Sequence, residues 1–128
     1  MELMKQLQDC GWKTFEQLIT EVFERHHYAS FWNVNLTIEG RRRQYDIIAV
    51  KGDKCVIVDC KKWDNRISRV SALKTAVEKH KQRCQFYNLL MQKTVTPVII
   101  TYNEEPILEY EHTYIVPLNR LNDFLLKS

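Results

Sequence analysis

Residues 44–63 read QYDIIAVKGDKCVIVDCKKW, two apolar runs joined by a short polar turn. The runs Arg43–Val50 and Cys55–Lys61 are rich in β-branched residues, which are typical of strands. Gly52 and Asp53 between them favour a tight turn, because both residue types adopt turn conformations readily. We therefore predict an antiparallel β-hairpin here.

Three charged side chains interrupt these apolar runs. Asp46 lies inside the first run, and Asp59 and Lys61 lie at the end of the second. Side chains alternate across a strand, so Asp59 and Lys61 should share one face of the sheet while Cys60 points to the other. Charged groups are costly to remove from water, so a purely structural role would favour apolar residues at these positions. The alternative is a structural ion pair at the strand end, and we expect a functional site.

The rest of the chain predicts helices and strands around this hairpin. Apolar residues at helical spacing predict amphipathic helices, and β-branched and aromatic runs predict strands. The predicted helices are Lys13–His27, Val70–Gln92 and Leu118–Leu126, and the further predicted strands are Phe31–Ile38, Val95–Tyr102 and Tyr114–Val116. Because a long helix separates the hairpin from the next strand, we expect a right-handed parallel crossover. The predicted fold class is α/β, a three-layer sandwich with a central mixed sheet, an αβββαβ core, and a C-terminal strand and helix.

The long helix Val70–Gln92 has one apolar stripe that we assign to the core. The stripe consists of Val70, Leu73, Val77, Cys84, Tyr87 and Met91. His80 lies in the middle of this stripe, where a buried core histidine is a more common role than a metal ligand or a base. Gln82 lies nearby in sequence but faces away.

The two acids are suited to a hard divalent cation. Mg²⁺ prefers carboxylate oxygens and keeps several waters, so one or two protein carboxylates and a phosphate suffice to hold it. Such an ion lowers the pKa of a bound water and offsets charge on a reacting phosphate. Lys61 would then add a positive charge near the attacking water or the scissile phosphate.

The helix Lys13–His27 offers a third acid. At about 100° per residue, Glu16 lies at the edge of the apolar stripe, whereas Glu21 and Glu24 lie on the opposite side. We therefore expect Glu16 to reach inward and to complete the metal site directly or through water. The alternative is a solvated acid near the helix N-terminus, where the macrodipole favours negative charge.

Three short motifs together resemble the PD-(D/E)XK, or restriction endonuclease-like, nuclease superfamily. The motifs are Gly11-x3-Phe15-Glu16, Gln44-Tyr45-Asp46-Ile47-Ile48-Ala49 and Val58-Asp59-Cys60-Lys61-Lys62-Trp63. They are most similar to the Mrr-like and archaeal Holliday junction resolvase-like branches, between about residues 11 and 92. The resemblance implies that Glu16, Asp46 and Asp59 bind the metal ion. It also implies that Lys61 assists catalysis. The length of 128 residues fits a single nuclease-like domain, residues 1–128. We expect this domain to use Mg²⁺, with Mn²⁺ as a substitute.

Basic and aromatic residues flank these acids and form a candidate nucleic-acid surface. They are Arg41, Arg42, Arg43, Lys62, Trp63, Arg66 and Arg69. The basic side chains would contact phosphates, and Trp63 would stack on a base or a sugar. The alternatives are a solvated charged face and, for Trp63, a cap on the core.

Charge and cysteine content narrow the possible partners and compartment. The net charge of +3 permits a polyanionic partner without requiring one. The four cysteines lack CxxC spacing, so we expect neither a zinc knuckle nor a disulfide framework. Reduced thiols indicate a cytoplasmic protein. No segment has the apolar length of a signal core or a membrane span, so we expect no membrane partner.

These observations predict a Mg²⁺-dependent DNA endonuclease, a metal-dependent phosphodiesterase with no small-molecule cofactor. A chain of 128 residues has little room for base-reading elements. By analogy we therefore expect a homodimer that cuts junctions or branched DNA. Two alternatives stay open: a nuclease-fold subunit that binds nucleic acid with weak or no catalysis, and an RNA endonuclease.

Overall fold

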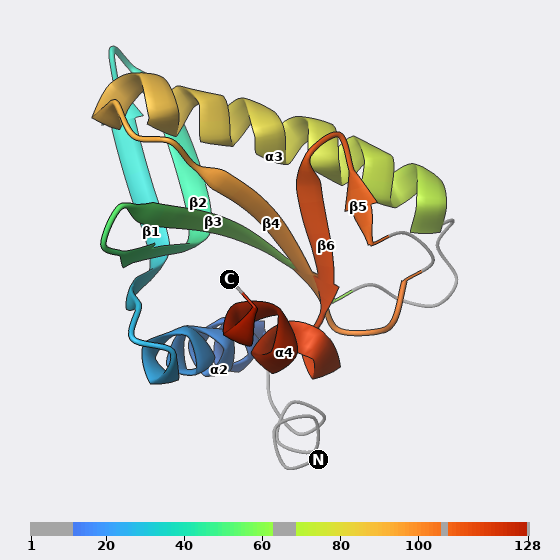
Figure 1. Ribbon diagram of the computed structural model, residues 1–128. Helices are drawn as coiled ribbons and strands as arrows, with labels where there is room; N and C mark the ends of the chain where they lie inside the picture. Colours follow the sequence, from blue (N-terminus) through green and yellow to red (C-terminus); the bar gives the residue numbers. More distant parts are fainter. Residues whose placement is uncertain (1–11, 63–68, 106–107, 128) are drawn as a thin grey trace.

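The protein's structure is a computed structural model that describes residues 12–62, 69–105 and 108–127 (Figure 1). Its helices are α2 (Trp12–Arg25), α3 (Arg69–Met91) and α4 (Leu121–Leu126), with a 3-10 turn, η1 (Leu118–Arg120), before α4. Its strands are β1 (Ala29–Ile38), β2 (Arg41–Lys51), β3 (Lys54–Lys61), β4 (Thr96–Thr101), β5 (Glu109–Tyr110) and β6 (Thr113–Pro117). Every predicted element is present within a few residues of its predicted bounds. The two-residue strand β5 was not predicted, because two residues are too few to show a period.

The strands form one mixed sheet in the order β1-β2-β3-β4-β6-β5. The pairs β1–β2 and β2–β3 are antiparallel, and β3–β4 and β4–β6 are parallel. The parallel pairing of β3 with β4 follows the long helix α3, as predicted. β4 lies at the centre of the sheet, and its residues Val98, Ile99 and Ile100 are fully buried.

Helices cover both faces of the sheet, so the molecule has three layers (Figure 1). One core cluster joins α2 and α4 to one face through residues such as Phe15, Ile19 and Leu121. Two further clusters lie under α3 on the other face, around Leu73 and Cys84. The predicted α/β three-layer sandwich is confirmed.

Helix α2 ends two residues before the predicted bound because His27 adopts the left-handed conformation, with a φ of 70°. The backbone N–H of Tyr28 donates to the carbonyl of Phe23 at 3.1 Å, and that of His27 donates to Glu24 at 3.0 Å. This pair of bonds closes a helix C-terminus of the Schellman type. The chain therefore turns directly from α2 into the edge strand β1.

The predicted core stripe of α3 is correct in its middle and wrong at its ends. Leu73 and Val77 are fully buried, but Val70 is 41% exposed and Met91 is 47% exposed. A helix of 23 residues spans about 34 Å, whereas the six-residue strand β4 spans about 20 Å. The first and last turns of α3 therefore extend past the ends of β4. Among the described residues no helix is long and apolar enough to cross a membrane.

Candidate active site

The predicted acids lie where strands β2 and β3 separate. Ladder pairing of the two strands runs from Lys51 opposite Lys54 to Ile47 opposite Val58, and it stops there. Asp46 is the next residue on β2 and Asp59 the next on β3. We call this point the fork.

The carboxylate of Asp46 bridges the fork to β3. Its Oδ2 accepts a hydrogen bond from the backbone N–H of Cys60 at 2.8 Å. A buried N–H that loses its ladder partner needs another acceptor, and here a side chain supplies it. The Asp46 carboxylate is therefore tethered to the middle residue of the Asp59-Cys60-Lys61 motif.

Regular side-chain alternation breaks at the fork. Tyr45 packs on the α3 side of the sheet, whereas Ile47, two residues later, packs on the α2 side. Strand β1 makes the same switch at Asn33, which has a φ of 54°. Asparagine tolerates this left-handed conformation better than most residues. The irregularity allows Asp46 to aim its carboxylate toward β3 rather than straight out of either face.

Asp46 and Asp59 are neighbours across the fork, and a side-chain hydrogen bond with Asp59 is one cause of the raised pKa of Asp46. Asp59 is only 5% exposed. Burial, followed by the neighbouring Asp59 carboxyl, raises the pKa of Asp46 to about 6, although the Cys60 N–H and the charge of Lys61 oppose this rise. Two adjoining carboxylates in a buried position favour a shared proton or a cation between them.

Two cations flank Asp59 on its two oxygens. Lys61 Nζ lies 3.2 Å from Asp59 Oδ2, and Arg83 Nη1 from α3 lies 3.9 Å from Asp59 Oδ1. The Lys61 contact agrees with the predicted common face. The hydroxyl of Tyr45 donates to the backbone carbonyl of Arg83 at 2.8 Å and so ties α3 to β2. Sequence reasoning missed Arg83, because a basic residue on a long polar helix gives no signal of its own.

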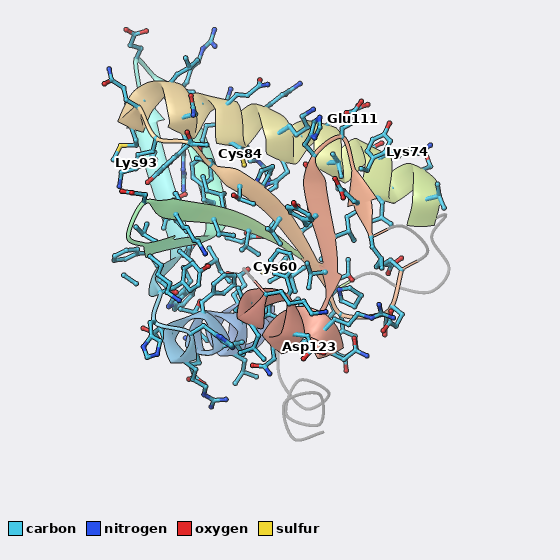
Figure 2. All side chains as sticks on the ribbon, viewed as in Figure 1. Cys60, Lys74, Cys84, Lys93, Glu111 and Asp123 are labelled. Carbon is cyan, nitrogen blue, oxygen red and sulfur yellow. The ribbon has the colours of Figure 1, made fainter. Side chains whose placement is uncertain are left out.

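Glu16 points inward from α2, toward the sheet. It is 7% exposed, whereas Glu21 and Glu24 are exposed, as the helical spacing predicted. Burial raises the pKa of the Cys60 thiol well above its usual value, and the charges of Asp46, Asp59 and Glu16 raise it further, so Glu16 lies near the fork on the α2 side. Cys60 itself packs between the sheet and α4 (Figure 2). Within the described residues, no three acid, histidine or cysteine side chains group as a metal-binding set.

His80 is a buried histidine that bonds to the motif strand. It is 2% exposed, and its Nε2 lies 2.8 Å from the carbonyl oxygen of Ile57, two residues before Asp59. Burial is the main cause that lowers the pKa of His80 to about 4, so the neutral ring donates from Nε2. His80 thus helps to position β3, in agreement with the predicted core role, and Gln82 is exposed.

The predicted nucleic-acid residues are only partly within the described structure. Arg41 and Arg42 are exposed on β2, while Arg43 is half-buried with its guanidinium 5.3 Å from the centre of the Phe86 ring. Lys62 is exposed, with its Nζ 5.1 Å from the centre of the Tyr102 ring. Trp63 and Arg66 lie outside the described residues, as does the side chain of Arg69.

Comparison with known proteins places the chain in a family. Residues 7–97 match the family model Mrr_cat, described as restriction endonuclease. The chain belongs to this restriction endonuclease family. The match includes Glu16 and both strands of the fork, and it agrees with the resemblance drawn from the three motifs.

One sequence relative and two solved structures are also similar to this chain. An uncharacterized protein of Archaeoglobus fulgidus is 26% identical over 114 residues, which cover 89% of this chain and 88% of that protein. The small subunit, R.BspD6I2, of the heterodimeric restriction endonuclease R.BspD6I is similar with a TM-score of 0.61 and 13% identity, over 98% of this chain and 85% of the subunit. The protein of unknown function AF1548 has a TM-score of 0.60 and 13% identity, over 84% of this chain. This chain spans only 58% of that structure. These likenesses confirm a restriction endonuclease-like fold.

Proposed function

We propose that this restriction endonuclease-family chain is a Mg²⁺-dependent DNA endonuclease that hydrolyses phosphodiester bonds. The observation that supports the proposal most strongly is the pairing of half-buried Asp46 with buried Asp59 at the fork, with Lys61 at 3.2 Å from Asp59. A structural ion pair would need only one acid and one base. The second carboxylate adds an electrostatic cost that a divalent cation would remove.

The chemistry of the acid pair fits Mg²⁺. Asp46 and Asp59 would hold the ion through hard carboxylate oxygens, with water and phosphate oxygens as further ligands. Mn²⁺ accepts the same oxygen ligands and should substitute. When bound, the ion would lower the pKa of a water and offset charge on the phosphate.

The remaining groups at the fork position the acids and the substrate. The Cys60 N–H holds one oxygen of Asp46, and His80 holds the β3 backbone at Ile57. The Lys61 side chain is 30% exposed, so its ammonium group is accessible to a phosphate in solution while it contacts Asp59. Arg83 supplies a second positive charge that would orient the same phosphate.

A homodimer is the assembly that we propose, because a single acid pair cuts one strand and a second copy would supply the cut in the other. Junctions and branched DNA are the substrates that the family resemblance favours. The decisive comparison uses branched and linear DNA of equal length, with Mg²⁺, with Mn²⁺ and with a chelator. Cleavage should need the metal, and a preference for branched DNA would support shape-selective cutting.

Variants of the fork test the assignment of the site. Asp59→Asn and Lys61→Met should each lower the cleavage rate by on the order of 100-fold or more, because each removes a charge used in the reaction. Asp53→Asn is a matched control, since Asp53 is an exposed acid in the turn between β2 and β3. Thermal melts establish that each variant is folded. Metal-dependent cleavage at the wild-type rate in Asp59→Asn protein would refute the proposal.

The second candidate function is a nuclease-fold subunit that binds nucleic acid with weak or no catalysis. It is favoured by the finding that no three acid, histidine or cysteine side chains of the described residues group as a metal-binding set. Salt-sensitive binding without cleavage of any DNA or RNA substrate would support it. Parallel digestion of RNA and DNA separates the proposed activity from an RNA endonuclease.

A further inference from the structure

One part of the sheet is covered by a helix on one face only. Beyond the fork, β1 and β2 continue as a two-stranded ribbon, here called the hairpin arm, residues 33–45. Its ladder runs from Val34 opposite Tyr45 to Ile38 opposite Arg41. Figure 1 shows its tip beside the C-terminal end of α3 and away from α2 and α4. Five residue pairs at about 3.4 Å each give an arm about 17 Å long.

The two faces of the hairpin arm differ in character. On the α3 side, Val34, Leu36 and Tyr45 pack with Tyr87 in one core cluster. The opposite face has no apolar side chain among its described residues. Its side chains are all exposed and polar: Asn33, Asn35, Thr37, Arg42 and Gln44.

Hydrogen bonds hold the polar side chains of this face in place. Arg42 donates from Nε at 3.3 Å and from Nη2 at 2.9 Å to Oδ1 of Asn35. Gln44 donates from Nε2 at 3.0 Å to Oδ1 of Asn33. Each bond leaves further donors on the arginine or the glutamine. Side chains that are ordered before binding lose less entropy when a partner binds.

We propose that this polar face of the hairpin arm enters the major groove of duplex DNA and reads base edges. The proposal rests on the proposed function for its choice of a DNA partner. A major groove about 12 Å wide and 8.5 Å deep admits a two-stranded β-ribbon. Arginine pairs with guanine, asparagine and glutamine pair with adenine, and the threonine methyl contacts thymine. These four residue types are the ones that this face presents.

The charge and position of the arm also favour a duplex at the fork. Arg41 is exposed at the tip of the arm and would meet a phosphate at the groove edge. Asn33 lies between the ladder positions of Trp32 and Val34 and therefore beside Asp46. Bases read by the arm would thus lie close to the bond that the acid pair cleaves. Duplex RNA is disfavoured, because the major groove of an A-form helix is too narrow for side chains to read.

The test is a selection from random DNA duplexes by full-length Asp59→Asn protein, which should leave bound DNA intact. We expect a short enriched motif, bound on the order of tenfold more tightly than a scrambled duplex at the same salt concentration. When Arg42→Met is added to the Asp59→Asn protein, the ratio of the affinities for the enriched and scrambled duplexes should fall close to one. Fluorescence anisotropy measures both affinities, and a thermal melt checks that each variant is folded.

Arg43→Met is the matched control, because Arg43 is the next residue but lies over Phe86 on the α3 side. It should leave the ratio of the two affinities unchanged, because the Arg43 side chain points away from the polar face. No enriched motif, a ratio that Arg42→Met does not change, or equal competition by duplex RNA of the selected sequence would each overturn the inference. Wild-type cleavage without a selected motif would refute only this inference. A selected motif that depends on Arg42, without cleavage, would refute only the proposed nuclease activity.

Discussion

The carboxylate of Asp46 accepts the backbone N–H of Cys60, the residue between Asp59 and Lys61. This bond replaces the ladder pairing that ends one residue earlier, at Ile47 opposite Val58. It couples two strands that would otherwise separate at the fork. The position of one acid is therefore determined by the backbone of the strand that holds the other, and several predictions about metal, pH and mutation depend on this coupling.

Removing the charge of Asp46 should stabilise the metal-free protein at neutral pH. The pKa of Asp46 is raised to about 6, so folding favours its protonated form. The contribution of protonated Asp46 to the stability of the folded protein is fully present below about pH 4 and is lost as the pH rises through about 6. Asp46→Asn should raise the unfolding free energy by on the order of 1–3 kcal/mol at pH 7.5 and by little at pH 4. Urea unfolding of both proteins in the presence of a chelator measures this difference in unfolding free energy at the two pH values. A variant that is less stable than wild type at pH 7.5 would contradict the prediction.

Arg83 should act on the substrate rather than on the fold. Arg83→Met should lower kcat by about tenfold or more, because it removes a charge-assisted contact to the phosphate. Arg83→Lys should restore part of the rate. Lys81→Met is the control on the same helix, since Lys81 Nζ pairs with Glu111 at 3.7 Å instead. Equal kcat values for the Arg83→Met and Lys81→Met proteins would remove Arg83 from the site.

His80 should make the free energy of unfolding fall in acid. Its pKa is lowered to about 4, so its contribution to stability is present above about pH 6.5 and is lost as the pH falls toward 4. His80→Leu should cost about 1 kcal/mol at pH 7.5 through the lost bond to Ile57. It should also lose less stability than wild type between pH 7 and 4.5. Chemical unfolding across this range tests both statements, and an unchanged pH slope would contradict them.

Glu16 should affect metal affinity less than either aspartate does. Glu16→Gln should raise the Mg²⁺ concentration needed for half-maximal cleavage by about tenfold, if the carboxylate reaches the ion through water, as outer partners of metal sites commonly do. Glu21→Gln, on the exposed face of α2, should leave that concentration unchanged. A Glu16→Gln protein with wild-type metal dependence would restrict the metal site to Asp46 and Asp59.

The sequence predicted the features that depend on local periodicity. Strand alternation predicted that Lys61 would share a face with Asp59 and that Cys60 would lie opposite, and helical spacing predicted that Glu16 would be buried. Each of these follows from positions a few residues apart on one element. The same local reasoning placed Met91 in the core incorrectly, because it contains no information on which strands lie beneath each turn of a helix.

The features that the sequence did not predict depend on how distant elements meet. Arg83 approaches Asp59 only because α3 crosses the sheet above the fork, a geometry that the Tyr45 hydroxyl helps to maintain. The break in alternation at Asn33 and Asp46 also violates the regular period on which strand prediction rests. The polar face of the hairpin arm became apparent only when the register showed which side chains lie together.

Anomalous diffraction from crystals soaked in Mn²⁺ tests the central proposal most directly, because it locates the ion without any assay of activity. We predict one peak between the carboxylates of Asp46 and Asp59, absent from crystals of Asp59→Asn protein. A strong peak elsewhere on the molecule, with no density between the two carboxylates, would contradict the proposed metal site.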